Sequence, residues 1–105
     1  MEWDVTPEEF KKELDAGKNV TLLDVREMEE IQLASIGGVH IPLGDLPVRF
    51  QELDPEKEIV VLCHHGVRSA HAVGFLRSQG FANVRNLRGG IDAWSLTVDP
   101  SVMRY

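Results

Sequence analysis

Residues 60–69 read Val60-Val61-Leu62-Cys63-His64-His65-Gly66-Val67-Arg68-Ser69, and this stretch decides the fold. The apolar run from Ile59 to Leu62 is rich in β-branched residues, which is typical of a strand buried inside a parallel sheet. Apolar residues then recur at helical spacing, so we expect a helix from about Ser69 to Gln79 that Gly80 ends. The only cysteine of the chain, Cys63, therefore lies where a buried strand gives way to a helix.

This position of Cys63 predicts an anion site. Ligands of open α/β sheets bind beside the loops that leave the carboxyl ends of strands. The N–H groups of such a loop converge, and the dipole of the following helix adds partial positive charge. Gly66 permits the tight turn, and Arg68 supplies a cation with five donors. We expect a Cys63 thiolate near neutral pH, the alternative being a buried and inert cysteine.

Similar patterns predict the other elements. Thr6-Pro7-Glu8-Glu9 is a strong helix start, because Thr6 caps the helix, Pro7 takes its first position and Glu9 completes a capping box. Further strands are expected at 3–5, 20–24, 39–41 and 84–87, and further helices at 27–34, 43–53 (interrupted by Pro47) and 91–96. Within these helices, Leu14 and Trp94 are expected to face the core. Met28, Ile31 and Leu33 are expected to be partly buried. Residues 97–105 lack periodicity and are expected to form a loose tail.

Composition limits the class of protein. The 105 residues, 43% of them apolar, suffice for one domain over residues 1–105 without a disulfide or metal staple. A single cysteine cannot form an internal disulfide, which fits a reducing compartment. The start Met1-Glu2-Trp3-Asp4 lacks the features of a secretory signal, and no apolar run approaches the length of a membrane span. These features predict a cytoplasmic protein without membrane contact, and nothing in them demands more than a monomer.

Charge is distributed unevenly along the chain. The net charge of −6 argues against a nucleic-acid partner. Residues 1–58 hold 15 acids and 6 bases, whereas residues 59–91 hold no acid, four arginines and three histidines. This segment predicts a positive field that attracts small anions, unless its arginines solvate the surface or pair with distant acids. We favour the second interpretation for Arg77 and Arg85, and the first for Arg68.

Two charged residues end another expected strand. Asp24 and Arg26 follow the apolar run that begins at Val20, so they could face the same crevice as Cys63. Arg26 would then be a second anion contact, or Asp24 a base. The alternative, an internal pair that braces the loop, is the commoner use of such residues. His40 is expected to be structural, and Arg88 to lie near one rim of the pocket.

Four stretches together resemble the single-domain rhodaneses, which are thiosulfate:acceptor sulfurtransferases. Residues 63–69 look like the active-site loop of that family. The other matching stretches are Asp24-Val25-Arg26-Glu27, Gly37-Gly38-Val39-His40-Ile41-Pro42 and Asn86-Leu87-Arg88-Gly89-Gly90-Ile91-Asp92-Ala93-Trp94. The resemblance implies an α/β, three-layer fold with a central parallel sheet of about five strands and helices on both faces. It also implies a persulfide on Cys63.

The implied reaction has two steps. The Cys63 thiolate takes the outer sulfur of thiosulfate or a similar small anionic donor, and cyanide or an external thiol then removes it. Arg68 would assist catalysis, and the loop residues His64, His65, Gly66, Val67 and Ser69, with Arg26, would bind the donor. Asp24 and Arg88 would support the site. No metal, nucleotide or flavin is implied, and the chain contains neither a Walker A sequence nor a GxGxxG fingerprint.

Two other functions use a similar cysteine. Protein tyrosine phosphatases and rhodanese-like dual-specificity phosphatases place five residues between cysteine and arginine, whereas only four lie between Cys63 and Arg68. A shorter loop forms a smaller cradle, better suited to one sulfur than to a tetrahedral phosphate or arsenate. The second function is non-enzymatic: a persulfide-carrying relay or binding module, or a redox sensor. A relay uses the same persulfide and needs an acceptor thiol from another molecule.

The two histidines of the loop leave two interpretations open. Either the imidazolium of His64 or His65 stabilises the thiolate or the donor anion, or only the backbone N–H groups of these residues matter. His71 lies nearby in sequence, but the spacing of Cys63 and the histidines matches no standard zinc pattern. We therefore expect no metal site.

Overall fold

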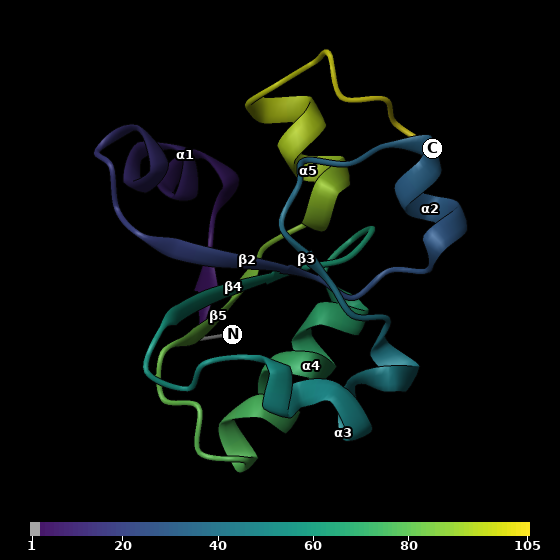
Figure 1. Ribbon diagram of the computed structural model, residues 1–105. Helices are drawn as coiled ribbons and strands as arrows, with labels where there is room; N and C mark the ends of the chain where they lie inside the picture. Colours follow the sequence, from purple (N-terminus) through teal and green to yellow (C-terminus); the bar gives the residue numbers. More distant parts are fainter. Residues whose placement is uncertain (1–2) are drawn as a thin grey trace.

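The computed structural model describes residues 3–105, which form a parallel sheet between two layers of helices (Figure 1). Met1 and Glu2, part of the start that was expected to lack a secretory signal, lie outside the described residues. Five strands in the order β1-β5-β4-β2-β3 make up the sheet, and every pairing is parallel. The expected α/β architecture is thus confirmed. The elements are β1 Asp4–Val5, α1 Pro7–Asp15, β2 Val20–Asp24, α2 Met28–Leu33, β3 Val39–His40, α3 Leu46–Arg49, β4 Glu58–Leu62, α4 Val67–Ser78, β5 Val84–Leu87 and α5 Gly90–Thr97.

Strand β4 lies at the centre of the sheet, as its apolar run predicts. It pairs with β2 on one side and β5 on the other, so both of its edges are hydrogen-bonded within the sheet. Ile59 and Val61 pack into the core on the α4 side, whereas Val60 and Leu62 pack into the core that includes α1 and α5. Their alternation follows the two-residue period of a strand and sets Cys63 at the carboxyl end of the central strand.

Helix α1 begins as the sequence predicts. Thr6 Oγ1 accepts from Glu9 N at 3.1 Å, and Glu9 Oε1 accepts from Thr6 N at 2.9 Å, which completes the capping box. Phe10 is buried and meets the Trp94 ring edge-on at 5.9 Å. Leu14 was expected to face the core but is 40% exposed, because this short helix covers the sheet only through its first turns.

Helix α2 covers the sheet less than expected. Met28 and Leu33 were expected to be partly buried, but they are 51% and 50% exposed, and Ile31 is half-buried. None of the described α2 side chains is fully buried. The helix instead turns a polar residue, Glu30, toward Arg68 in the first turn of α4.

The segment 43–53 is broken as expected. Helix α3 is flanked by two 3₁₀ turns, Leu43–Asp45 and Phe50–Glu52, and Pro47 falls in its first turn. Helix α4 begins at Val67, two residues before the expected start, because Gly66 takes the left-handed conformation (φ 101°) just before it.

The loose tail expected at residues 97–105 is wrong: Thr97 ends α5, and residues 98–105 pack against the fold. Val98, Val102 and Tyr105 contact the core cluster on the α1 and α5 side, and Ser95 Oγ donates to Val102 O at 2.5 Å. The chain ends beside α2 (Figure 1). A segment without periodicity can still pack when single apolar residues meet a surface that distant elements build.

Within residues 3–105, no helix has both the length and the apolar character needed to cross a lipid bilayer.

Candidate active site

The Cys63 thiol lies in the loop between β4 and α4 and is almost fully buried. Its Sγ accepts from Gly66 N at 3.1 Å and from Ser69 N at 3.4 Å. Ser69 Oγ lies 3.3 Å from Sγ, but the Ser69 hydroxyl has only one proton and donates it to Asn86 Oδ1, at the shorter distance of 2.5 Å. Backbone N–H groups are therefore the main donors to the sulfur.

Further donors in the same loop lack a protein acceptor. Within residues 3–105, the N–H groups of His64, His65, Val67 and Arg68 make no hydrogen bond to the protein. The last two belong to the first turn of α4, where the helix itself offers no acceptor and the dipole is positive. These four N–H groups of the loop are therefore free to donate to a bound anion.

Asn86 holds the loop in this shape. It lies on β5, beside β4, and its Nδ2 donates to Gly66 O at 3.1 Å while its Oδ1 accepts from Ser69 Oγ. The side chain thereby joins both ends of the turn that carries the donors. Asn86 was noted in the sequence only as part of a motif, although a buried amide in an otherwise apolar strand is a signal for such a role.

Helix α5 closes the loop from the other side. Ile91 N donates to Cys63 O at 2.9 Å and Asp92 N donates to His64 O at 3.1 Å, so these carbonyls are turned toward α5. Gly90 makes this approach possible, since a Cβ there would lie 2.4 Å from Cys63 O. Arg88, expected near a rim of the pocket, is 60% exposed at its side chain and pairs with Asp4 at 3.3 Å.

We predict that Gly90→Ala destabilises the protein by about 2 kcal/mol or more, because φ is +63° there and the new methyl group meets the backbone of Cys63 and His64. Gly74→Ala is the matched control. Gly74 lies inside α4 with no atom within 4 Å of its added Cβ, so alanine should stabilise by about 0.5–1 kcal/mol. Urea unfolding of both variants measures the difference, and equal midpoints would contradict the close approach.

Arg68 is paired, contrary to expectation. Its Nη1 and Nη2 donate to Glu30 Oε1 and Oε2 at 2.6 and 2.8 Å, with Arg68 35% and Glu30 19% exposed. The Arg68 guanidinium lowers the pKa of Glu30 to about 2, and the carboxylate raises the pKa of Arg68. Arg68 lies close enough to Cys63 for an electrostatic interaction between the two groups, which adds to the raised pKa of Arg68. The site therefore holds a salt-bridged cation beside the thiol.

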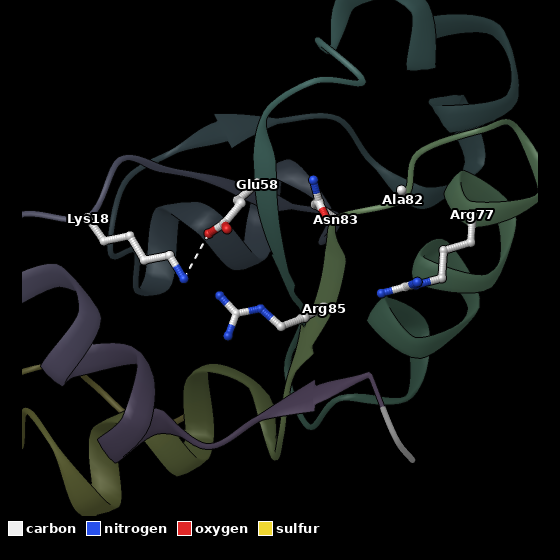
Figure 2. A pocket seen from close by; sticks show the side chains of 6 residues that line it. All are labelled: Lys18, Glu58, Arg77, Ala82, Asn83 and Arg85. Atoms are coloured by element: carbon white, nitrogen blue, oxygen red, sulfur yellow. Dashed lines mark ion pairs between the residues drawn. The ribbon is translucent and has the colours of Figure 1, made fainter.

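The other arginines of the acid-free segment are also engaged. Arg85 forms a bidentate pair with Glu13 at 2.7 and 2.8 Å, and Arg77 donates to Val84 O and stacks on the Trp3 ring. The acids come from the first half of the chain, so folding largely cancels the positive field that residues 59–91 predict. Lys18, Glu58, Arg77, Ala82, Asn83 and Arg85 line a cavity of about 270 Å³. It lies at the amino ends of the strands, opposite Cys63 (Figure 2).

Arg26 is completely buried, and its donors are directed at the protein. Its Nε and Nη2 donate to Asp24 at 2.7–3.2 Å, its Nη2 also to Ala34 O at 2.9 Å, and its Nη1 to Glu30 O and the Tyr105 hydroxyl. Its backbone N–H also donates to Asp24 Oδ1. This geometry favours a brace within the scaffold over a direct contact between Arg26 and the donor. His40 Nε2 lies 2.6 Å from Arg26 O, which agrees with a structural role for that histidine.

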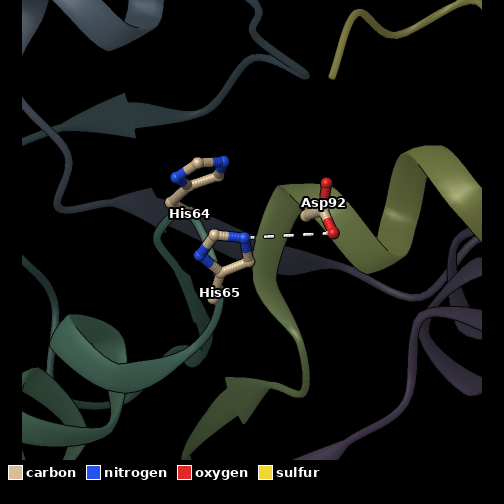
Figure 3. A group of neighbouring side chains, drawn as sticks. All are labelled: His64, His65 and Asp92. Atoms are coloured by element: carbon tan, nitrogen blue, oxygen red, sulfur yellow. Dashed lines mark ion pairs between the residues drawn. The ribbon is translucent and has the colours of Figure 1, made fainter. Parts of the chain in front are cut away.

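His64 and His65 lie one over the other above the loop (Figure 3), with ring centroids 3.8 Å apart and planes at 29°. His65 is exposed, and its Nε2 is 4.0 Å from Asp92 Oδ2. One ligand atom of each of these three residues falls within 4.8 Å of the others, as in a metal site. The nitrogen lone pairs of the two stacked rings, however, lie in separate planes 29° apart and do not point at one common atom. Asp92 Oδ1 also already accepts a hydrogen bond from Arg104 Nε at 2.9 Å. A metal bound by both histidines would need at least one ring to rotate.

Comparisons with known proteins agree with this geometry. The family model described as "Rhodanese-like domain" matches residues 6–97. The putative sulfurtransferase YtwF of Bacillus subtilis (strain 168) is 39% identical over 92 residues, covering 87% of this chain and 88% of that protein. The putative sulfur carrier protein YrkF of the same organism is 41% identical over 93 residues, or 88% of this chain. The chain spans only 50% of the length of YrkF.

Solved structures share the fold. The crystal structure of a rhodanese-related protein from Thermoplasma volcanium superimposes with a TM-score of 0.84 at 33% identity, covering 97% of this chain and 98% of that one.

Proposed function

Because the chain belongs to the rhodanese-like domain family, we propose that it transfers sulfane sulfur through a persulfide on Cys63. The observation that carries the proposal is the set of backbone N–H donors in the loop that holds Cys63. Two N–H groups already donate to the sulfur, and four more in the same loop make no hydrogen bond within residues 3–105. A persulfide places its charged terminal sulfur one bond beyond Sγ, where these N–H groups would stabilise it.

The reaction proceeds in two displacements at sulfur. The Cys63 thiolate attacks the outer sulfur of thiosulfate, the S–S bond breaks, and sulfite leaves with the bonding electron pair. A thiolate or cyanide then attacks the terminal sulfur of the persulfide, and the Cys63 thiolate leaves. No proton, metal or redox cofactor is required for either step. Cys63 is the sole cysteine, so the acceptor thiol belongs to another molecule.

A relay that passes sulfur between proteins uses the same intermediate. Relatives of this chain are named both as a sulfurtransferase and as a sulfur carrier, which supports either role. The absence of an internal disulfide fits a reducing, cytoplasmic setting for such a thiol. An enzyme and a relay differ in the acceptor, not in the chemistry at Cys63.

The test is the intact mass of the protein before and after incubation with thiosulfate. We expect a gain of one sulfur atom that cyanide or a dithiol reverses, and no gain in Cys63→Ser. If the protein gains a sulfur atom only from a low-molecular-weight persulfide, the donor is not thiosulfate, but the mechanism through Cys63 still holds. No gain with either donor would contradict the proposal and direct the work to phosphate and arsenate esters.

The Glu30–Arg68 pair leads to a prediction about how the anionic sulfur donor binds. Glu30→Gln removes the carboxylate charge that holds Arg68, while the amide oxygen can still accept a hydrogen bond. The guanidinium would then be free to bind the doubly charged thiosulfate, so its KM should fall about three- to tenfold. The control Glu52→Gln breaks an exposed pair with Arg49 and should leave KM unchanged. An unchanged KM in Glu30→Gln would show that Arg68 does not contact the donor.

A further inference from the structure

Tyr105 lies outside every motif of the sequence, yet it contacts two parts of the site. Its ring stacks on the His64 imidazole with centroids 3.9 Å apart and planes only 9° from parallel. Its hydroxyl donates to Glu30 Oε2 at 2.7 Å and accepts from Arg26 Nη1 at 2.9 Å. One side chain thus joins the catalytic loop to the buried arginine and to the carboxylate that holds Arg68.

The stack is what orients the His64 side chain. His64 Nε2 is buried and has no hydrogen-bond partner within the described part of the chain. The imidazole instead lies between two rings, Tyr105 on one face and His65 on the other. Stacking of this kind is weak but directional, so it holds the plane of the ring in one orientation. Because His64 directly follows Cys63, its orientation also bears on the first N–H group of the donor loop.

Glu30 is the second point of contact. Each of its carboxylate oxygens accepts twice: Oε1 from Arg68 Nη1 and Glu27 N, and Oε2 from Arg68 Nη2 and the Tyr105 hydroxyl. These four hydrogen bonds fix the orientation of the Glu30 carboxylate. Because Arg68 pairs with both carboxylate oxygens, the orientation of its guanidinium is fixed as well. Burial raises the pKa of Tyr105, which keeps the hydroxyl protonated and able to donate to Glu30.

The residues that precede Tyr105 hold it in place. Val102 is bonded to Ser95 on α5, and Arg104 forms an ion pair with Asp92 at 2.9 Å. The side chains of Val98 and Val102 pack on the core beneath. A loosely attached segment would not bring an aromatic ring to a fixed place over the loop.

We propose that Tyr105 is a positioning residue of the sulfurtransfer site: its ring orients His64, and its hydroxyl ties the Glu30–Arg68 pair to Arg26. The role rests on the proposed function, because it concerns the rate of loading Cys63 with sulfur. The ring and the hydroxyl do different work. The ring acts on the loop that carries the donors, whereas the hydroxyl mainly satisfies buried polar groups.

Two variants separate these contributions. Tyr105→Phe keeps the ring and removes the hydroxyl, and Tyr105→Leu removes both. We expect Tyr105→Phe to lower the urea midpoint but to load sulfur within about twofold of the wild-type rate. Tyr105→Leu should lower the kcat of loading about fivefold, with little change in KM, at a temperature where every variant is folded. The control Met103→Ala, half-exposed in the same segment, should alter neither property.

A spectroscopic readout makes the test independent of activity. In the wild type and in Tyr105→Phe, the stacked ring should shift the His64 carbon-bound proton resonances upfield, and Tyr105→Leu should lose this shift. Equal loading rates in Tyr105→Phe and Tyr105→Leu, in a wild type that forms the persulfide, would overturn the positioning role. A wild type that never gains sulfur would instead overturn the proposed function, and the His64 resonances would still show whether Tyr105 orients the ring.

Discussion

Replacing Cys63 with serine is expected to slow sulfur transfer by more than about 1000-fold, the scale seen when a covalent nucleophile is removed. A serine hydroxyl is not ionised near neutral pH and cannot hold a transferable sulfur. The N–H groups of Gly66 and Ser69 can donate to oxygen as they do to Sγ, so the loop should keep its shape. The free energy of unfolding should therefore change by no more than about 1 kcal/mol.

Steady-state turnover and urea unfolding of the same preparation check both parts of this prediction. A folded Cys63→Ser protein without activity supports the covalent route. A folded variant that still turns over would contradict any mechanism through a persulfide. A variant that fails to fold would show that the thiol is mainly a packing group, which is the alternative that a buried cysteine always raises.

Removing Asp24 is expected to have the largest effect on stability. Asp24→Ala leaves the guanidinium of Arg26, 0% exposed, without the carboxylate that accepts from its Nε and Nη2. An uncompensated charge that stays buried costs about 3–5 kcal/mol. A loss of this size could unfold a domain of 105 residues near physiological temperature.

The control is a carboxylate of an exposed pair. Asp45 lies 3.9 Å from Arg49 at 56% exposure, so Asp45→Ala should change stability by less than about 0.5 kcal/mol. Urea midpoints give the comparison, and an unchanged slope with denaturant would show that both variants unfold in the same way. A small loss in Asp24→Ala, accompanied by a raised KM for thiosulfate, would instead restore the interpretation of Arg26 as a contact for the donor.

Several elements of the fold were predictable because their signals are local. The buried strand at the centre of the sheet, the Thr6–Glu9 capping box and the broken helical segment around Pro47 each depend on residues a few positions apart. Exposure was harder to predict. Leu14, Met28 and Leu33 have the spacing of buried residues, but whether a helix face is covered depends on how far neighbouring elements extend over it.

The charged residues of the site were the least predictable. Arg68 meets Glu30, 38 positions away, and Arg85 meets Glu13, 72 positions away. Such partners come together only through the strand order and the crossovers between strands, which no local pattern encodes. The structure shows Glu30 in a local capping box with Glu27, and this local contact gives no sign of the pairing between Glu30 and Arg68. Nothing in the sequence around Tyr105 indicates that its ring reaches His64.

By itself, then, the sequence determined the strand-loop-helix unit that places Cys63 at a strand end, because hydrophobic periodicity, capping and glycine turns act over a few residues. It also determined the donor loop, since the N–H groups of residues 64–69 lie within one turn. The tertiary structure decided which cations remain available near the sulfur, how Asn86 shapes the loop and where Tyr105 packs. Those contacts join residues from distant parts of the chain, and their energies depend on burial and distance, which exist only once the sheet has formed.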